Sequence, residues 1–131
     1  MRLRSLLFVP GDSERKFVRA QDCGADALIL DLEDSVAPTE KRNARARAGG
    51  LIEPEPGRDW TFIVRVNALD TDLTLDDLAA VVKPGLDALL IPKVNGAADL
   101  ERIGHYLDAL EAKAGMASGS VKLAKIGRAH V

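Results

Sequence analysis

The chain has 131 residues, of which 47% are hydrophobic and 29% charged, and its net charge is −2 at pH 7. This balance indicates a soluble globular domain with a core of its own and excludes a disordered chain. No basic cluster is flanked by aromatic residues and no apolar run approaches the ~20 residues of a membrane helix, which argues against nucleic-acid and membrane partners. The single cysteine, Cys23, cannot form an internal disulfide, and the first residues are too short for a signal-peptide core, so we expect a cytoplasmic protein.

The first predicted element is a strand over residues 3–9, which are rich in Leu, Phe and Val and stop at Pro10. Either Asp12 or Ser13 can cap the helix that follows it. Gly24 stands where that helix is expected to end.

An apolar run at 27–30 predicts a second strand over 24–33, buried on both faces. It ends in three carboxylates, Asp31, Glu33 and Asp34. In parallel α/β proteins the carboxyl ends of the strands carry the chemistry, so this strand end is a candidate site.

Pro38 and Thr39 predict the start of a second helix with Thr39 as its cap, and the glycine pair at 49–50 is expected to end or fray it. The β-branched and aromatic residues of 60–66 predict a third strand.

A third helix is expected to begin near Asp76 and to end at 83–85, before a fourth strand at 86–91. A fourth helix follows Gly96, because apolar residues recur there at helical spacing. A fifth strand is expected to start within 121–126.

The chain also contains an internal echo, since residues 24–30 resemble residues 85–91. Repeated βα modules indicate a parallel sheet with right-handed crossovers. Such modules build either a TIM barrel or a doubly wound sheet.

Unusual polar or turn residues follow the carboxyl ends of the first four predicted strands, and barrel enzymes recruit residues from several strand ends. Gly11 lets backbone amides approach a ligand there. Arg65 lies inside an apolar strand, where a charge is costly unless it is paired, and its guanidinium can bind a carboxylate through two hydrogen bonds. The candidate residues are Pro10, Gly11, Glu33, Asp34, Arg65, Asn67 and Lys93.

Five short motifs combine these strand ends with two basic residues of the second predicted helix. They are Phe8-Val9-Pro10-Gly11, Asp31-Leu32-Glu33-Asp34-Ser35-Val36, Lys41 with Arg45, Val64-Arg65-Val66-Asn67 and Pro92-Lys93-Val94. In order and spacing they resemble the HpcH/HpaI aldolase and citrate lyase beta-subunit family, from Arg4 to about Lys125. The citrate lyase beta and malyl-CoA lyase branch is the more similar one.

The resemblance implies an α/β fold, a partial TIM (β/α)8 barrel that consists of the first four βα units and the start of strand five, with residues 1–125 as its N-terminal half. It implies a magnesium-dependent carbon–carbon lyase that acts on a citryl- or malyl-type thioester of CoA or of an acyl carrier. The implied partner is a small-molecule carboxylate or acyl-CoA, and the full-length form is expected to be a homo-oligomer.

The resemblance also implies roles for the candidate residues. Arg65 is expected to hold the substrate carboxylate, and Glu33 and Asp34 are expected to be catalytic and to line the metal and substrate pocket. The direct Mg²⁺ ligands of the family come from strands five and six, so they are expected beyond Lys125 and no metal ligand is assigned within the chain. The remaining substrate-binding candidates are Lys93, Pro10 and Gly11.

The last residues, 126–131, match the peptide encoded by a common sequencing adapter, and we interpret them as a non-native tail on a truncated chain. His130 is therefore not assigned as a ligand. His105 is expected to be an exposed helix residue and Cys23 a packing residue. Because half a barrel leaves strand edges unpaired and its inner face uncovered, we expect the 131 residues alone to be inactive and to dimerise or aggregate.

Two other readings remain open. In a receiver-like signalling domain, Asp31, Glu33 or Asp34 accepts phosphate with the help of a lysine, although Arg65 has no role there. The chain can also be a structural fragment without activity. The sequence does not separate citryl from malyl substrates, or a lyase from a thioesterase.

Overall fold

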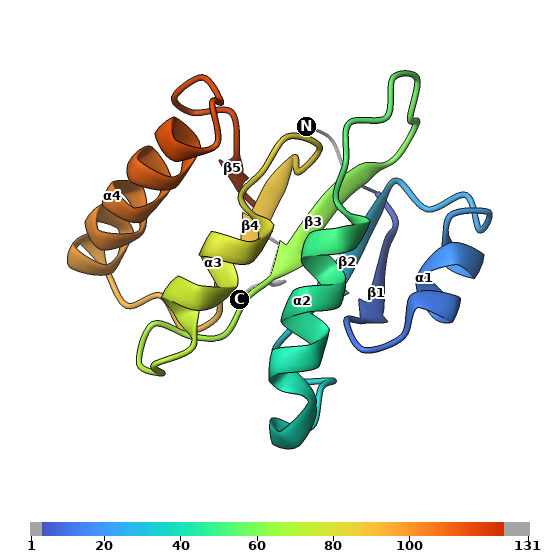
Figure 1. Cartoon of the computed structure of the whole chain (residues 1–131), viewed down its shortest axis with the longest axis horizontal. Coiled ribbons are helices and arrows are strands. Elements are labelled where there is room, and N and C mark those ends of the chain that lie inside the picture. The colour runs from blue at the N-terminus through green and yellow to red at the C-terminus, as the bar shows by residue number, and fades with distance from the viewer. Residues whose placement is uncertain (1–3, 125–131) are drawn as a thin grey trace.

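The computed structural model describes residues 4–124, in which strands and helices alternate along the chain (Figure 1). The elements are β1 (Leu6–Pro10), α1 (Glu14–Ala20), β2 (Ala27–Asp31), the 3₁₀ turn η1 (Pro38–Glu40), α2 (Lys41–Leu51), β3 (Thr61–Arg65), α3 (Thr74–Val81), β4 (Ala88–Leu90), α4 (Ala97–Lys113) and β5 (Lys122–Leu123).

The five strands form one parallel sheet in the order β1-β2-β3-β4-β5, and the helices lie on one side of it (Figure 1). A doubly wound sheet reverses its strand order and carries helices on both faces. Sequential order with helices on one side is instead the arrangement of consecutive units in a TIM barrel. The receiver-like alternative is therefore wrong, and the predicted partial barrel is the observed fold.

Alternate residues of each central strand face the helices. Leu28, Leu30, Phe62 and Val64 pack into a large core that includes Phe17 of α1 and several residues of the other three helices. Their neighbours along the strands form a second, smaller cluster on the opposite face. That cluster contains Ala27, Ile29, Ile63 and Ala88, with Leu6, Leu90 and Ala124 packed against it.

The face opposite the helices is less open than we expected for part of a barrel. Ile29 and Ile63, at its centre, have no exposed surface. Large apolar exposure on this face occurs at the rim, where Phe8 of the edge strand β1 is 42% exposed. The exposed apolar surface available for self-association is therefore smaller than we expected for the uncovered inner face of half a barrel.

Ser13 caps α1, since its side-chain oxygen accepts a hydrogen bond from the Lys16 amide at 3.2 Å, as one of the two predicted alternatives required. The helix ends at Ala20, earlier than the predicted stop at Gly24, which has a φ of +79° in the turn before β2. Cys23, in the same turn, is exposed, so the expectation that it packs is wrong.

The predicted ends of the second helix are both wrong. Pro38 and Thr39 form a separate 3₁₀ turn, and no side chain caps α2. The helix continues through the glycine pair to Leu51. A Cβ on Gly49 would lie 2.9 Å from the Ala80 carbonyl oxygen, so this glycine allows α2 and α3 to approach closely rather than ending the helix.

The later elements agree with prediction apart from their ends. Helix α3 begins at Thr74, two residues before the predicted Asp76, and β4 is shorter than 86–91. His105 is exposed on α4, as expected. Strand β5 begins within the predicted segment, but the tail 126–131 with His130 lies outside the described residues. No helix within residues 4–124 is both long and apolar enough to cross a bilayer.

Candidate active site at the carboxyl end of the sheet

Arg65 ends β3 beside Asp31, which ends β2. The guanidinium donates from Nε to Asp31 Oδ1 at 2.9 Å and from Nη2 to Asp31 Oδ2 at 2.7 Å. The Asp31 side chain is 1% exposed and the Arg65 side chain 22% exposed. We expected a charge within this apolar strand to need a partner. The neighbouring strand β2 supplies that partner, the carboxylate of Asp31.

Asp31 also organises the turn that follows β2. Its Oδ1 accepts the Glu33 amide and its Oδ2 accepts the Ser35 amide, both at 2.9 Å. Burial by itself would raise the pKa of Asp31, but the hydrogen bonds from Arg65 and from these two amides outweigh it and lower the pKa to about 2. Asp31 is therefore ionised at neutral pH, with each oxygen holding two donors.

Arg65 is fixed on two further sides. The Glu33 carboxylate lies 3.5 Å from its Nε, and the ring of Phe8 lies 4.8 Å from its central carbon. The hydrogen bond to Asp31 raises the pKa of Arg65. Asp31 occupies one edge of the guanidinium only, and within residues 4–124 no hydrogen bond is recorded from Nη1. Because the Arg65 side chain is 22% exposed, we expect the Nη1 end to receive a carboxylate from solvent.

Gly11 and Pro10 stand beside this pair. The Gly11 amide donates to the Asp31 carbonyl oxygen at 2.8 Å, and a Cβ on Gly11 would lie 2.7 Å from that oxygen. Glycine is thus needed for close packing of the turn after β1 against β2. Because the Gly11 amide donates to Asp31, it is not directed to a ligand. Contact of Pro10 and Gly11 with substrate stays a prediction.

Asp34 and Lys93 lie at the same end of the sheet but are not joined to Arg65. Asp34 is exposed. Lys93 lines a separate cavity of about 210 Å³ together with Asp70, Asp99 and Arg102. Its φ of 57° is in the left-handed region, a backbone strain that often occurs at functional sites. The structure therefore brings Glu33 to Arg65 but places Lys93 in a neighbouring cavity.

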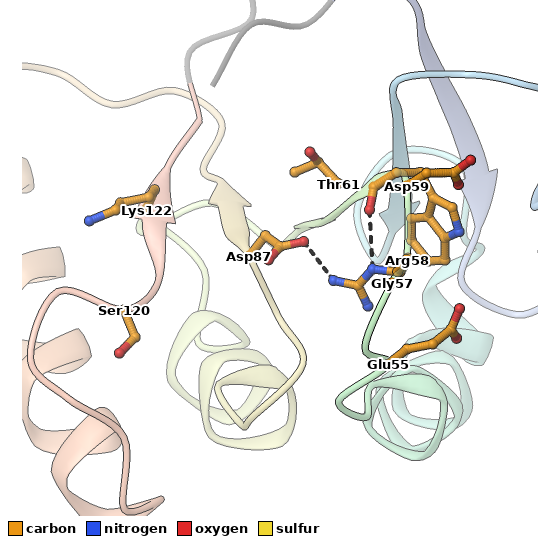
Figure 2. A pocket seen from close by; sticks show the side chains of 9 residues that line it. Glu55, Gly57, Arg58, Asp59, Thr61, Asp87, Ser120 and Lys122 are labelled. Atoms are coloured by element: carbon orange, nitrogen blue, oxygen red, sulfur yellow. Dashed lines mark hydrogen bonds and ion pairs between the residues drawn. The ribbon is translucent and has the colours of Figure 1, made fainter.

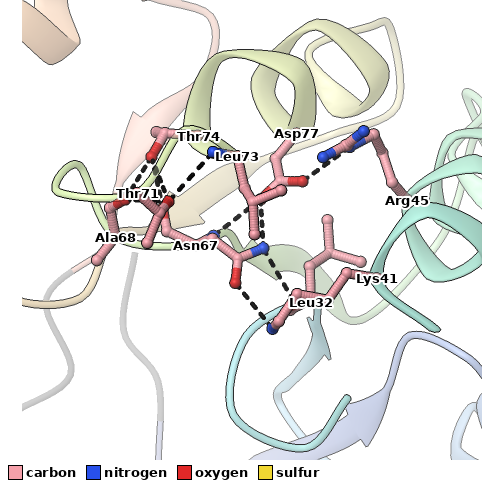
Figure 3. A network of polar contacts seen from close by, with 9 residues as sticks. All are labelled: Leu32, Lys41, Arg45, Asn67, Ala68, Thr71, Leu73, Thr74 and Asp77. Atoms are coloured by element: carbon pink, nitrogen blue, oxygen red, sulfur yellow. Dashed lines mark hydrogen bonds and ion pairs between the residues drawn. The ribbon is translucent and has the colours of Figure 1, made fainter. Parts of the chain in front are cut away.

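A second polar network lies behind the Asp31 turn and connects β2, α2, β3 and α3 (Figure 3). Lys41 donates to the Leu32 and Glu33 carbonyl oxygens and to Asn67 Oδ1. Asn67 donates to Asp77, and Asp77 accepts a further hydrogen bond from Arg45. These are residues of the resembling motifs, together with one carboxylate from outside them.

Sequence reasoning missed two of these roles. Asp31 was named as a carboxylate of the candidate strand end but not as the partner of Arg65, although a charge at the equivalent position of the next strand signalled a pair. Asp77, near the predicted start of the third helix, was given no side-chain partner, yet it is 1% exposed and accepts from Asn67 and Arg45. No local signal reveals this, because Arg45 and Asp77 are 32 positions apart.

The residues at hand do not assemble a magnesium site. Mg²⁺ prefers several oxygen ligands in octahedral geometry. Among residues 4–124, no three His, Cys, Asp or Glu side chains come together. Because Asp31 binds Arg65, Glu33 and Asp34 are the nearby carboxylates that could still bind a metal ion.

A cavity of about 600 Å³ lies at the opposite, amino end of the sheet (Figure 2). There Arg58 Nη2 donates to Asp87 Oδ2 at 2.6 Å and to the Gly85 carbonyl oxygen, and its guanidinium packs 4.7 Å from the Trp60 ring. This end of a barrel generally serves stability, and it contains none of the predicted site residues.

Sequential parallel strands with helices on one side define the fold as part of a TIM barrel. A family model for HpcH/HpaI aldolase/citrate lyase matches residues 4–126, and the chain belongs to this family.

Two relatives carry names from the branch that the motifs indicated. The chain is 47% identical over 100 residues to a (3S)-malyl-CoA thioesterase of Cereibacter sphaeroides (strain ATCC 17029), covering 76% of this chain and 35% of that protein. It is 41% identical over 120 residues to the citrate lyase subunit beta of Escherichia coli (strain K12), covering 92% and 40%. The chain thus spans 35% to 40% of the length of these relatives.

Solved structures agree on the fold. The citrate lyase beta subunit of M. tuberculosis, complexed with oxaloacetate and magnesium, matches with a TM-score of 0.64 and 27% identity, over 90% of this chain and 55% of that one. A Haloferax volcanii malate synthase matches with a TM-score of 0.80 over 92% of this chain and 38% of that one, but at 19% identity this similarity concerns the fold alone.

Proposed function

We propose that this chain is the N-terminal part of a magnesium-dependent carbon–carbon lyase for a citryl- or malyl-type thioester of CoA or an acyl carrier. The observation that carries the proposal is the Arg65 guanidinium, which Asp31 holds through Nε and Nη2 on a side chain that is 22% exposed. An arginine fixed in this way is suited to bidentate recognition of a substrate carboxylate.

In the proposed reaction, the substrate hydroxyl loses its proton and the adjacent carbon–carbon bond breaks. The electron pair passes to the carbon next to the thioester carbonyl, which then takes up a proton. Arg65 holds the carboxylate of the oxoacid that leaves, and Glu33 or Asp34 exchanges the proton. The 3.5 Å between Glu33 and Arg65 places a carboxylate beside the proposed carboxylate-binding group.

Magnesium would stabilise the enolate charge as a Lewis acid. The M. tuberculosis relative is complexed with oxaloacetate and magnesium, which supports both the cofactor and the class of acid. The direct magnesium ligands of the present protein are proposed to lie beyond Lys125. Lys93 is proposed as a further substrate contact. Cytoplasmic location, homo-oligomerisation and the division of the chain at residue 125 stay predictions.

Thioester hydrolysis is the second candidate, because the Cereibacter sphaeroides relative is a (3S)-malyl-CoA thioesterase. Both reactions need the same carboxylate recognition. They differ in whether the carbon–carbon bond or the thioester bond breaks.

The test is incubation of the longest protein that contains this chain with malyl-CoA or citryl-CoA and Mg²⁺, followed by mass spectrometry of the products. Acetyl-CoA with glyoxylate or oxaloacetate identifies a lyase, and malate or citrate with free CoA identifies a thioesterase. Intact substrate in every assay, with folded protein, would refute both. The 131 residues alone, which we expect to be inactive, form a separate sample for the same assay and for sedimentation.

A further inference from the structure

Lys41, the first residue of α2, has an ammonium group with three acceptors, and Figure 3 draws it beside two of the residues that supply them, Leu32 and Asn67. Its Nζ lies 2.6 Å from the Glu33 carbonyl oxygen, 2.9 Å from Asn67 Oδ1 and 3.1 Å from the Leu32 carbonyl oxygen. A lysine ammonium has three hydrogens to donate, so this arrangement satisfies it completely. The side chain is thus directed inward to the end of β2 and not to solvent.

These contacts clamp the backbone of Glu33 from both sides. Its amide donates to Asp31 Oδ1 at 2.9 Å, and its carbonyl oxygen accepts from Lys41 at 2.6 Å. The Glu33 carboxylate is held less tightly than its backbone, because its recorded partner among residues 4–124 is Arg65 at 3.5 Å. A fixed backbone with an available carboxylate is the arrangement that a proton-transferring group requires.

The clamp is itself anchored in the core. The amide group of Asn67 donates to Asp77 Oδ2 at 2.7 Å, and Arg45 Nε donates to Asp77 Oδ1 at 2.9 Å. Asp77 is 1% exposed. Because partly satisfied buried networks are costly, this closed set of contacts holds Lys41 in a single position relative to β2 and β3.

We propose that Lys41 is a positioning residue for the reaction. It fixes the Glu33 backbone so that the Glu33 carboxylate stands beside the group that Arg65 binds, without touching the substrate itself. The proposal rests on the proposed function, in which Glu33 or Asp34 exchanges a proton, and it takes Glu33 as that group. A lysine that only ties elements together is the competing explanation.

Lys83 supplies a matched control for that explanation. Its Nζ donates to one backbone carbonyl, that of Gly49 near the end of α2, at 2.8 Å. Like Lys41 it is a partly buried lysine bound to backbone oxygen. Unlike Lys41 it has no contact with the turn after β2. Lys41→Met and Lys83→Met therefore both remove a lysine hydrogen bond to backbone oxygen, at different places, although Lys41→Met removes three hydrogen bonds and Lys83→Met one.

The first measurement is amide hydrogen exchange, residue by residue, on the 131-residue chain and the two variants. We expect Lys41→Met to speed exchange at Glu33 and Ser35 by about tenfold or more beyond the change in global stability, since a released turn opens locally. Lys83→Met should leave these amides unchanged. Equal exchange there in both variants would overturn the proposal. If Lys41→Met does not fold, Lys41→Arg, which keeps the charge but not the compact ammonium, is judged by the same criterion.

The second measurement uses the longest protein that contains the chain. Lys41→Met should lower kcat on the order of 10- to 100-fold with KM within about threefold, because misplacement of a reacting group costs rate rather than binding. Lys83→Met should leave both constants near the wild-type values. An unchanged kcat in Lys41→Met contradicts the proposal. Absence of any activity in the wild type would refute the proposed function, while the exchange data still decide on Lys41.

Discussion

Two arginine–aspartate pairs stand at opposite ends of one sheet and are built in opposite ways. In the pair at the carboxyl end, the Asp31 side chain is 1% exposed and the Arg65 side chain 22%. In the pair at the amino end, the Arg58 side chain is 10% exposed and the Asp87 side chain 41%. The more exposed partner is thus the arginine in the first pair and the aspartate in the second.

The remaining contacts explain the difference. Arg58 donates to the backbone carbonyls of Trp60 and Gly85 and to Asp87; Figure 2 shows the contact with Asp87. Arg65 donates to Asp31 through Nε and Nη2, and its side chain stays 22% exposed. An arginine with its donors satisfied by the fold stabilises the structure, whereas one held on a single edge is prepared to bind an anion.

The internal echo belongs to the amino end. Asp26 accepts hydrogen bonds from the amides of Arg4 and Ser5, and Asp87 accepts one from the Phe62 amide. In both cases the aspartate before a strand binds an amide at or near the start of the preceding strand. Hydrogen bonds from these amides lower the pKa of Asp26. The repeated motif is therefore a device for joining strands and not a duplicated site.

The largest expected effect is on activity, which should depend on Arg65 but not on Arg58. In the longest protein that contains the chain, Arg65→Lys should reduce kcat/KM by an amount equivalent to about 2–4 kcal/mol, because the forked donor geometry is lost. Arg58→Lys should lower the melting temperature with kcat/KM unchanged. Steady-state kinetics and thermal unfolding measure the two responses. Unchanged kcat/KM in Arg65→Lys would remove Arg65 from the site.

The aspartates should differ in stability. Asp31→Asn leaves a partly buried guanidinium without its counter-charge and should lower the free energy of unfolding by about 2–3 kcal/mol. Asp87→Asn removes an exposed charge from Arg58, which keeps two carbonyl partners, and should cost less than about 1 kcal/mol. Urea unfolding of the chain measures both values. Equal losses would show that burial does not distinguish the pairs.

The low pKa of Asp31 predicts a difference in acid stability. Because its pKa falls from 3.8 to about 2 on folding, its contribution is fully present above pH 5 and is lost as the pH falls through 2. The loss attributable to Asp31 is about 2 kcal/mol. Unfolding free energies between pH 5 and pH 2 should therefore fall more steeply in the wild type than in Asp31→Asn. Parallel curves would contradict the assigned pKa.

The smallest effect concerns the ring beside Arg65. Phe8 is largely exposed and lies 4.8 Å from the guanidinium centre. Phe8→Leu keeps an apolar side chain but removes the cation–π contact, which should cost about 0.5–1 kcal/mol of stability. Urea unfolding of Phe8→Leu with and without Arg65→Met, as a double-mutant cycle, isolates the contact, because methionine carries no charge. Additive losses would mean that the ring does not interact with the cation.

The sequence by itself determined the strands, their parallel arrangement and the end of the sheet that carries the candidate site. These features depend on local signals, such as the apolar run before Asp31 and the charge of Arg65 within an apolar strand. Helix ends were less predictable. Thr39 has the chemistry of a cap, and the glycine pair has the chemistry of a stop, but packing of Gly49 against α3 overrides the second signal.

Only the tertiary structure decided which side chains meet. Asp31 and Arg65 are 34 positions apart and pair because the parallel register of β2 and β3 places both at the same strand end. Lys41 and Asn67 meet because α2 begins where β3 ends. Local patterns specify what each segment can form, whereas contacts between distant segments depend on strand register and helix packing. For this reason a one-edge clamp on Arg65 and a backbone clamp on Glu33 could be found only in the folded chain.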